Sequence, residues 1–119
     1  MPITFTNHVK ALFKDGVELL QTLTPKKVML WHAGTGVCGE AGELIDAIKK
    51  HIAYNRPIDR ENMVEELGDL EFYMEAVRQT TGITREETLE YNKVKLKDRY
   101  PKGVYRDIDA HERKDKQSG

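Results

Sequence analysis

The sequence predicts an all-α protein, and three observations carry this prediction. Apolar residues recur with the spacing of amphipathic helices through residues 1–100. Capping residues, prolines and glycines stand where that spacing is interrupted, and no segment alternates apolar and polar residues as a strand does. With 119 residues, the chain has the size of one domain. We expect a helical domain over residues 1–101 and a charged tail over residues 102–119.

Four helices are predicted within this domain, and together they predict a four-helix bundle. The second helix starts with Pro25, because proline is favoured at the first helical position. Asp59 caps the third helix, and Gly82 ends it in the conformation that glycine adopts most easily. Thr84 begins a capping box that opens the fourth helix. The predicted helices cover residues 4–22, 25–54, 59–81 and 84–100.

Four glycines interrupt the second helix, at positions 34, 36, 39 and 42. A glycine inside a helix costs about 1 kcal/mol relative to alanine. We therefore expect either a kink in this helix or a neighbouring group that lies very close to its backbone.

The overall charge argues against several classes of protein. Nineteen basic residues face 20 acidic ones, for a formal net charge of −1. Direct binding to nucleic acid is not expected, because nucleic-acid-binding domains usually carry a basic excess. No apolar run has the length of a membrane span, and no signal peptide is recognisable. The sequence thus predicts a soluble cytoplasmic protein with no membrane partner.

Two pairs of carboxylates are the most informative residues. Glu40 and Glu43 share one side of the second helix, and Glu66 and Asp69 share one side of the third, because three-residue spacing brings side chains together. Both pairs flank the apolar stripe of their helix. If the helices pack antiparallel, as a short connection favours, the four carboxylates converge. Mg²⁺, or alternatively Mn²⁺, would neutralise them, since hard cations prefer oxygen ligands.

The acidic residues also allow two other interpretations. Acidic residues beside a helix seam are commonly just solvated, so the spacing alone leaves this alternative open. A ferritin-like di-iron site requires Glu-x-x-His on two helices. Met29 and Ile48 stand three residues before His32 and His51, so the di-iron interpretation fails.

A second group lies on the fourth helix. Asn92, Lys95 and Arg99 share one side of this helix, and the two cations are placed to bind a phosphate. The alternative is a basic C-terminal half that simply complements the helix dipole.

These motifs together resemble a known family. Residues 39–44 (GEAGEL), residues 65–70 (EELGDL) and residues 92–101 (NKVKLKDRYP) are similar to segments of MazG-type nucleoside triphosphate pyrophosphohydrolases. The resemblance covers roughly residues 28–101. One difference stands out: Gly39 occupies the position of the first glutamate in the family's EExxE motif.

The resemblance implies a site and an activity. The activity is hydrolysis of a nucleoside triphosphate between the α and β phosphates, giving a monophosphate and pyrophosphate, for nucleotide housecleaning or pool control. The implied roles, by position in this sequence, are Mg²⁺ ligands (Glu40, Glu43, Glu66, Asp69), catalytic carboxylates (Glu43, Glu40) and nucleotide-binding residues (Asn92, Lys95, Arg99, His32, Tyr73, Trp31). Trp31 also has an alternative interpretation as a core residue.

The resemblance also implies an oligomer, since MazG-like bundles are completed by dimerisation and sometimes form tetramers. Phe72 and Ala76 agree with this, because they extend the apolar arc of the third helix beyond the needs of one small bundle. Two alternatives remain: a non-catalytic helical dimer that binds a nucleotide or a protein, and a dUTP- or dCTP-directed hydrolase of the same superfamily.

Overall fold

The computed structural model describes residues 2–116, and within that range the protein is all-α, as predicted, with no strand. The helical segments are α1 (Phe5–Leu12), α2 (Gly16–Thr22), α3 (Pro25–Ala53), α4 (Arg60–Thr81), α5 (Arg85–Arg99), α6 (Asp107–Glu112) and the 3₁₀ turn η1 (Lys114–Lys116).

The predicted boundaries of the three longest helices are confirmed. The Thr24 hydroxyl accepts a hydrogen bond from the backbone N–H of Lys27 and so caps α3. Asp59 and Thr84 cap α4 and α5 in the same way. Gly82 ends α4 with a left-handed φ of 72°, a conformation that glycine adopts without steric cost. These ends are determined locally, because the three starting caps join residues three positions apart and the Gly82 N–H bonds to the carbonyls of Arg78 and Gln79.

The prediction of one helix over residues 4–22 is wrong. Helix α1 ends at Leu12, Phe13 is extended, and α2 begins only at Gly16. The cause is Asp15, whose carboxylate accepts a hydrogen bond from the backbone N–H of Val17 and starts a new helix. The apolar spacing continues across this break and therefore hides it.

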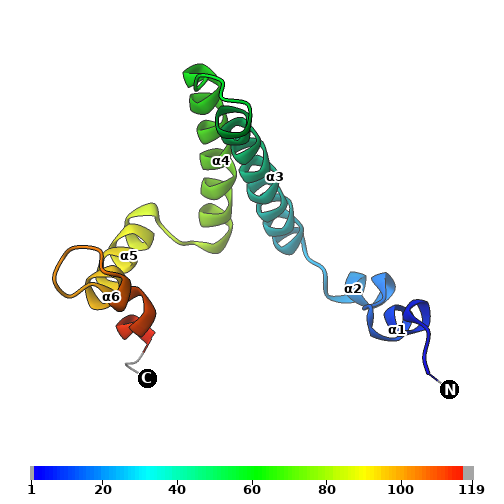
Figure 1. Cartoon of the computed structure of the whole chain (residues 1–119). Coiled ribbons are helices and arrows are strands. Elements are labelled where there is room, and N and C mark those ends of the chain that lie inside the picture. Colours follow the sequence, from blue (N-terminus) through cyan, green and yellow to red (C-terminus); the bar gives the residue numbers. More distant parts are fainter. Residues whose placement is uncertain (1, 117–119) are drawn as a thin grey trace.

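Helices α3 and α4 form an antiparallel hairpin, which is the central unit of the structure (Figure 1). Helix α3 is continuous over its whole length, despite its glycines. The turn between the helices includes Asn55, which has a positive φ of 51°. Nδ1 of His51, in the last turn of α3, lies 2.6 Å from the backbone oxygen of Arg56 in this turn. Among the described residues, Ala33 at the hairpin interface is the one buried apolar side chain.

A four-helix bundle is not formed by the single chain. Figure 1 shows α1 and α2 on one side of the α3–α4 hairpin and α5 and α6 on the other. The radius of gyration is 20.4 Å, whereas a compact domain of this length has about 13.5 Å. The apolar side chains of the N-terminal helices remain in solvent: Phe5 and Phe13 are each 80% exposed. The predicted apolar faces exist, but nothing in one described chain covers them.

The C-terminal segment is more structured than a simple charged tail. Helix α6 and η1 pack on α5, and Asp115 forms an ion pair with Arg99 at 3.0 Å. Residues 117–119 of the predicted tail lie outside the described residues.

Candidate metal and nucleotide site

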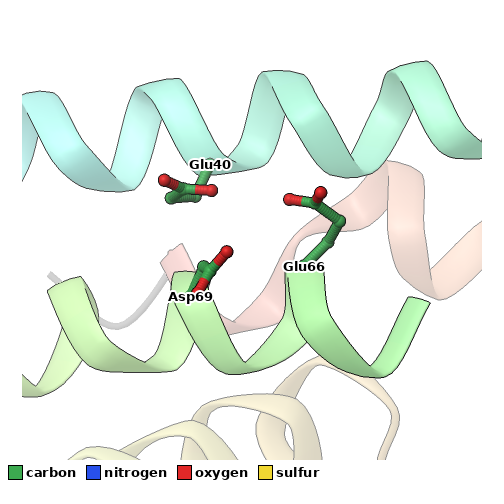
Figure 2. A group of neighbouring side chains, drawn as sticks. All are labelled: Glu40, Glu66 and Asp69. Carbon is green, nitrogen blue, oxygen red and sulfur yellow. The ribbon is translucent and has the colours of Figure 1, made fainter. Parts of the chain in front are cut away.

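Three carboxylates meet between α3 and α4. Glu40 comes from α3, and Glu66 and Asp69 come from α4; one oxygen of each lies within 4.8 Å of the others. Figure 2 shows the three side chains pointing into the space between the two helices. The site is open on one side, because Glu40 and Glu66 are half-buried while Asp69 is exposed.

The antiparallel register brings these residues together. Glu66 and Asp69 share a face of α4 because they are three residues apart. Gly36 of α3 faces the ring of Tyr73 on α4. Glu40 lies one turn after Gly36, and Asp69 lies one turn before Tyr73. The two helices run in opposite directions. One turn forward along α3 and one turn backward along α4 therefore lead from this contact to the same acidic group.

The carboxyl of Glu66 is perturbed by its surroundings. Burial raises the pKa of its carboxyl above the usual value, and the neighbouring charges of Glu40, Glu43, Asp69 and Glu65 raise it further. Its Oε2 atom is buried and has no hydrogen-bonding partner within the described part of the chain. A buried carboxylate oxygen without a donor is costly. The neighbouring negative charges and the unpaired oxygen therefore make ionisation of Glu66 unfavourable.

These residues fit a hard divalent cation. All three side chains offer carboxylate oxygens, which Mg²⁺ and Mn²⁺ prefer. A cation would supply the missing partner for Oε2 of Glu66 and would offset the mutual repulsion that raises the pKa of its carboxyl. The acidic group therefore has the composition, spacing and electrostatic need of a metal site.

Glu43 does not belong to this group of three. It is exposed on α3, and its oxygens are not among those that lie within 4.8 Å of one another. Its charge still acts on Glu66, whose pKa it raises. The predicted convergence of four carboxylates is thus reduced to three, with Glu43 beside them.

A small pocket lies next to the acidic group. The rings of His32 and Tyr73 are adjacent, with centroids 6.1 Å apart. The ring of Phe72 lies edge-on to that of Tyr73, with the ring centroids 5.2 Å apart. These three side chains, with Met29, Ala33, Ala76 and Thr80, line a pocket of about 230 Å³. Trp31 does not line it and is 70% exposed, so the interpretation of Trp31 as a core residue fails for the single chain.

Gly36 allows Tyr73 to lie directly against the backbone of α3. A Cβ atom at position 36 would overlap the Tyr73 ring, whereas a Cβ at Gly34, Gly39 or Gly42 would meet no atom within 4 Å. The expectation of a close neighbour is therefore confirmed at Gly36, and the kink is not needed to explain it.

The structure does not bring the predicted phosphate-binding residues to the acidic group within one chain. Helix α5 lies apart from the α3–α4 hairpin (Figure 1). On α5, Asn92 is exposed and Lys95 is half-buried. The Arg99 side chain is only 18% exposed because it binds Asp115.

Sequence reasoning missed Asp115 and Arg113. The Asp115 carboxylate accepts hydrogen bonds from Arg99 and from Arg113. Hydrogen bonds from Arg99 and then from Arg113 hold the pKa of Asp115 well below its usual range. The only signal in the sequence was a charged segment, which does not identify pairs of residues.

Comparison with known proteins identifies a family for this chain. A family model for the MazG nucleotide pyrophosphohydrolase domain matches residues 33–104. The match covers more than half of the chain and includes the acidic group and α5. The chain belongs to the MazG nucleotide pyrophosphohydrolase family. No curated protein and no solved structure matches it.

The family assignment supports nucleotide pyrophosphohydrolase activity in general terms and a dependence on divalent metal, which is typical of the family. Along the described residues, no helix combines the length and the apolar character that crossing a membrane requires.

Proposed function

We propose that this protein hydrolyses nucleoside triphosphates between the α and β phosphates, releasing a monophosphate and pyrophosphate, with Mg²⁺ or Mn²⁺ as cofactor. The observation that carries the proposal is the acidic group of Glu40, Glu66 and Asp69, found in a chain of the MazG family. The role in the cell would be nucleotide housecleaning or control of a nucleotide pool.

Glu40, Glu66 and Asp69 would hold the divalent ion. When bound, such an ion neutralises charge on phosphate oxygens and lowers the pKa of water. Glu43 is the best candidate to orient the attacking water and accept its proton, with Glu40 as the second catalytic carboxylate. The position of Glu43 supports this, because it is exposed and close enough to Glu66 to raise the pKa of that carboxyl.

The nucleotide would extend from the acidic group towards the neighbouring pocket. His32 and Tyr73 line that pocket, with Tyr73 one turn from Asp69 on α4 and His32 two turns from Glu40 on α3, which supports a role in contacting the base. Trp31 is exposed on the preceding position of α3 and is a further candidate for stacking. Lys95 and Arg99 would bind the outer phosphates, and Asn92 would bind a phosphate or the sugar.

The proposed active site requires a second copy of the chain. Helix α5 lies apart from the acidic group of its own chain (Figure 1), so a cation on α5 would act on phosphates bound at the acids of another copy. Large apolar side chains are exposed on nearly every helix, including Phe72 of α4, which is 70% exposed. Such surfaces are typical of chains that associate. A dimer, or a tetramer built from dimers, would cover them and complete the bundle.

The experiment is pyrophosphate release from ribo- and deoxyribonucleoside triphosphates, measured with Mg²⁺, with Mn²⁺ and with EDTA. Wild type is compared with Glu66→Gln and with Glu61→Gln, an exposed residue in the first turn of the same helix. We expect metal-dependent release that Glu66→Gln abolishes and Glu61→Gln retains. Release of single phosphates would contradict the proposed bond. A preference for dUTP or dCTP would select the specialised alternative.

A non-catalytic dimer is the second candidate, and Gly39 favours it, because the family glutamate is replaced there by a residue without a carboxylate. Absence of turnover across the panel, combined with tight nucleotide binding, would support this second candidate.

A further inference from the structure

The carboxylate of Asp115 lies between two arginines. Nε and Nη2 of Arg99 donate to Oδ1 and Oδ2 at 3.0 and 3.2 Å. Nε and Nη2 of Arg113 donate to the same two oxygens at 3.3 Å each. The Asp115 side chain is only 1% exposed. One carboxylate therefore accepts four charged hydrogen bonds and is enclosed by the groups that bind it.

This arrangement has the geometry of an oxyanion site. A guanidinium presents its N–H groups as a planar fork, which matches two oxygens of a carboxylate or of a phosphate. Arg99 and Arg113 each use such a fork on the same pair of oxygens. Two cations face one anion, so the group keeps a positive charge. A phosphate with two negative charges would neutralise the pair of arginines more completely than Asp115 does.

The element that carries Asp115 is short. This residue belongs to η1, a 3₁₀ turn of three residues near the end of the described chain. The preceding Arg113 already has a left-handed φ of 51°, so the turn is not a continuation of α6. To release Asp115, only this three-residue turn has to open, while α5 and the other helices stay folded.

We propose that Arg99 and Arg113 form a binding site for a phosphate group of a polyphosphate chain, and that Asp115 occupies this site in the free protein until the phosphate displaces it. The proposal rests on the proposed function for the origin of that phosphate, the nucleotide substrate. It adds Arg113 to the phosphate-binding residues and makes η1 an internal competitor of the substrate.

The test is calorimetric titration of the full-length protein with tripolyphosphate in EDTA, which keeps the acidic group free of metal. Three variants are compared with wild type: Asp115→Asn, the double variant Asp115→Asn with Arg113→Gln, and Asp98→Asn. Asp98 is exposed on α5, and its substitution removes one negative charge near Arg99 without touching the arginine pair. Circular dichroism of each variant checks that the helices remain.

We expect Asp115→Asn to bind tripolyphosphate about three- to tenfold more tightly than Asp98→Asn, because removing an internal competitor raises the fraction of open sites. The double variant should lose most of this gain. If Asp115→Asn binds no more tightly than Asp98→Asn, or binds more weakly than wild type, Asp115 is not a competitor and the proposal is wrong. A double variant that keeps the full gain would remove Arg113 from the site.

Failure of this proposal and failure of the proposed function are distinguishable. The titration measures anion binding without turnover, so the gain in Asp115→Asn can be observed in a protein that hydrolyses nothing. Conversely, normal pyrophosphate release in a protein whose Asp115→Asn variant shows no gain would overturn only the phosphate site proposed at Arg99 and Arg113.

Discussion

Substitution of Gly36 by alanine tests how the acidic group is positioned. A Cβ atom at this position would overlap the Tyr73 ring, so the ring or helix α4 must move. Overpacking of this kind typically costs about 1–3 kcal/mol of stability. The change from glycine to alanine within a helix returns about 1 kcal/mol. We therefore expect Gly36→Ala to lower the free energy of unfolding by up to about 2 kcal/mol.

Gly42→Ala is the matched control. Gly42 lies on the same helix, and a Cβ there would meet no atom within 4 Å. This variant gains the helix propensity without the overlap, so we expect it to be stabilised by up to about 1 kcal/mol. The difference between the two variants, about 1–3 kcal/mol, isolates the steric contribution.

The assay is urea unfolding followed by circular dichroism at a fixed protein concentration, because association contributes to apparent stability. The Tyr73→Ala background supplies a second check. Without the ring, Gly36→Ala should become neutral or stabilising, giving a coupling energy between the two positions. Equal stabilities for Gly36→Ala and Gly42→Ala would refute the close contact. Because the contact lies one turn from Glu40 and Asp69, Gly36→Ala should also weaken Mn²⁺ binding.

Four further predictions concern the site and the assembly that completes it. In EDTA, the stability of wild type should fall relative to that of Glu66→Gln as the pH rises from about 4 to 7. Folding raises the pKa of the Glu66 carboxyl. The stabilisation that this carboxyl contributes is therefore fully present below its ordinary pKa and is lost as the pH rises through the raised pKa of the folded state. Urea midpoints that differ by the same amount at every pH would contradict this. Added Mn²⁺ should raise the urea midpoint of wild type more than that of Glu66→Gln, since only wild type keeps all three carboxylates; equal shifts would exclude Glu66 as a ligand. Finally, Glu66→Gln and Lys95→Ala subunits, each inactive alone, should regain part of the activity when unfolded and refolded together, because a mixed dimer has one intact site. Light scattering should show a dimer at micromolar concentration, and a monomer would rule out shared sites.

The sequence by itself determined where the long helices begin and end. Thr24, Asp59 and Thr84 each cap a helix through a hydrogen bond to a residue three positions away, and Gly82 ends one through its own backbone conformation. Such interactions depend only on neighbours in the chain. The prediction of one helix over residues 4–22 failed at Asp15. This residue also caps a helix through a local hydrogen bond, but the apolar pattern continues across it and hides the break.

The sequence determined the candidate site in part. That Glu66 and Asp69 share one face of their helix follows from helix geometry alone. That Glu40 joins them while Glu43 stays outside depends on the rotation and offset of two packed helices. Those quantities are set by contacts such as Gly36 against Tyr73, and helix periodicity does not contain them.

Only the tertiary structure decided which groups the α5 cations meet. The sequence identified Arg99 as a cation on one face of a helix, and its partner Asp115 lies 16 residues further along. Residues 100–106 connect α5 to α6 outside any helix, and the way this connection returns η1 to α5 is not encoded in the apolar pattern. The sequence therefore established which residues carry charge and on which helical face they lie. The tertiary fold decided that the acidic residues converge and that Arg99 forms an ion pair with Asp115. It also decided that α5 lies apart from the acidic residues of its own chain. The physical reason is that capping and periodicity act within one helix, while the site depends on how separate helices pack.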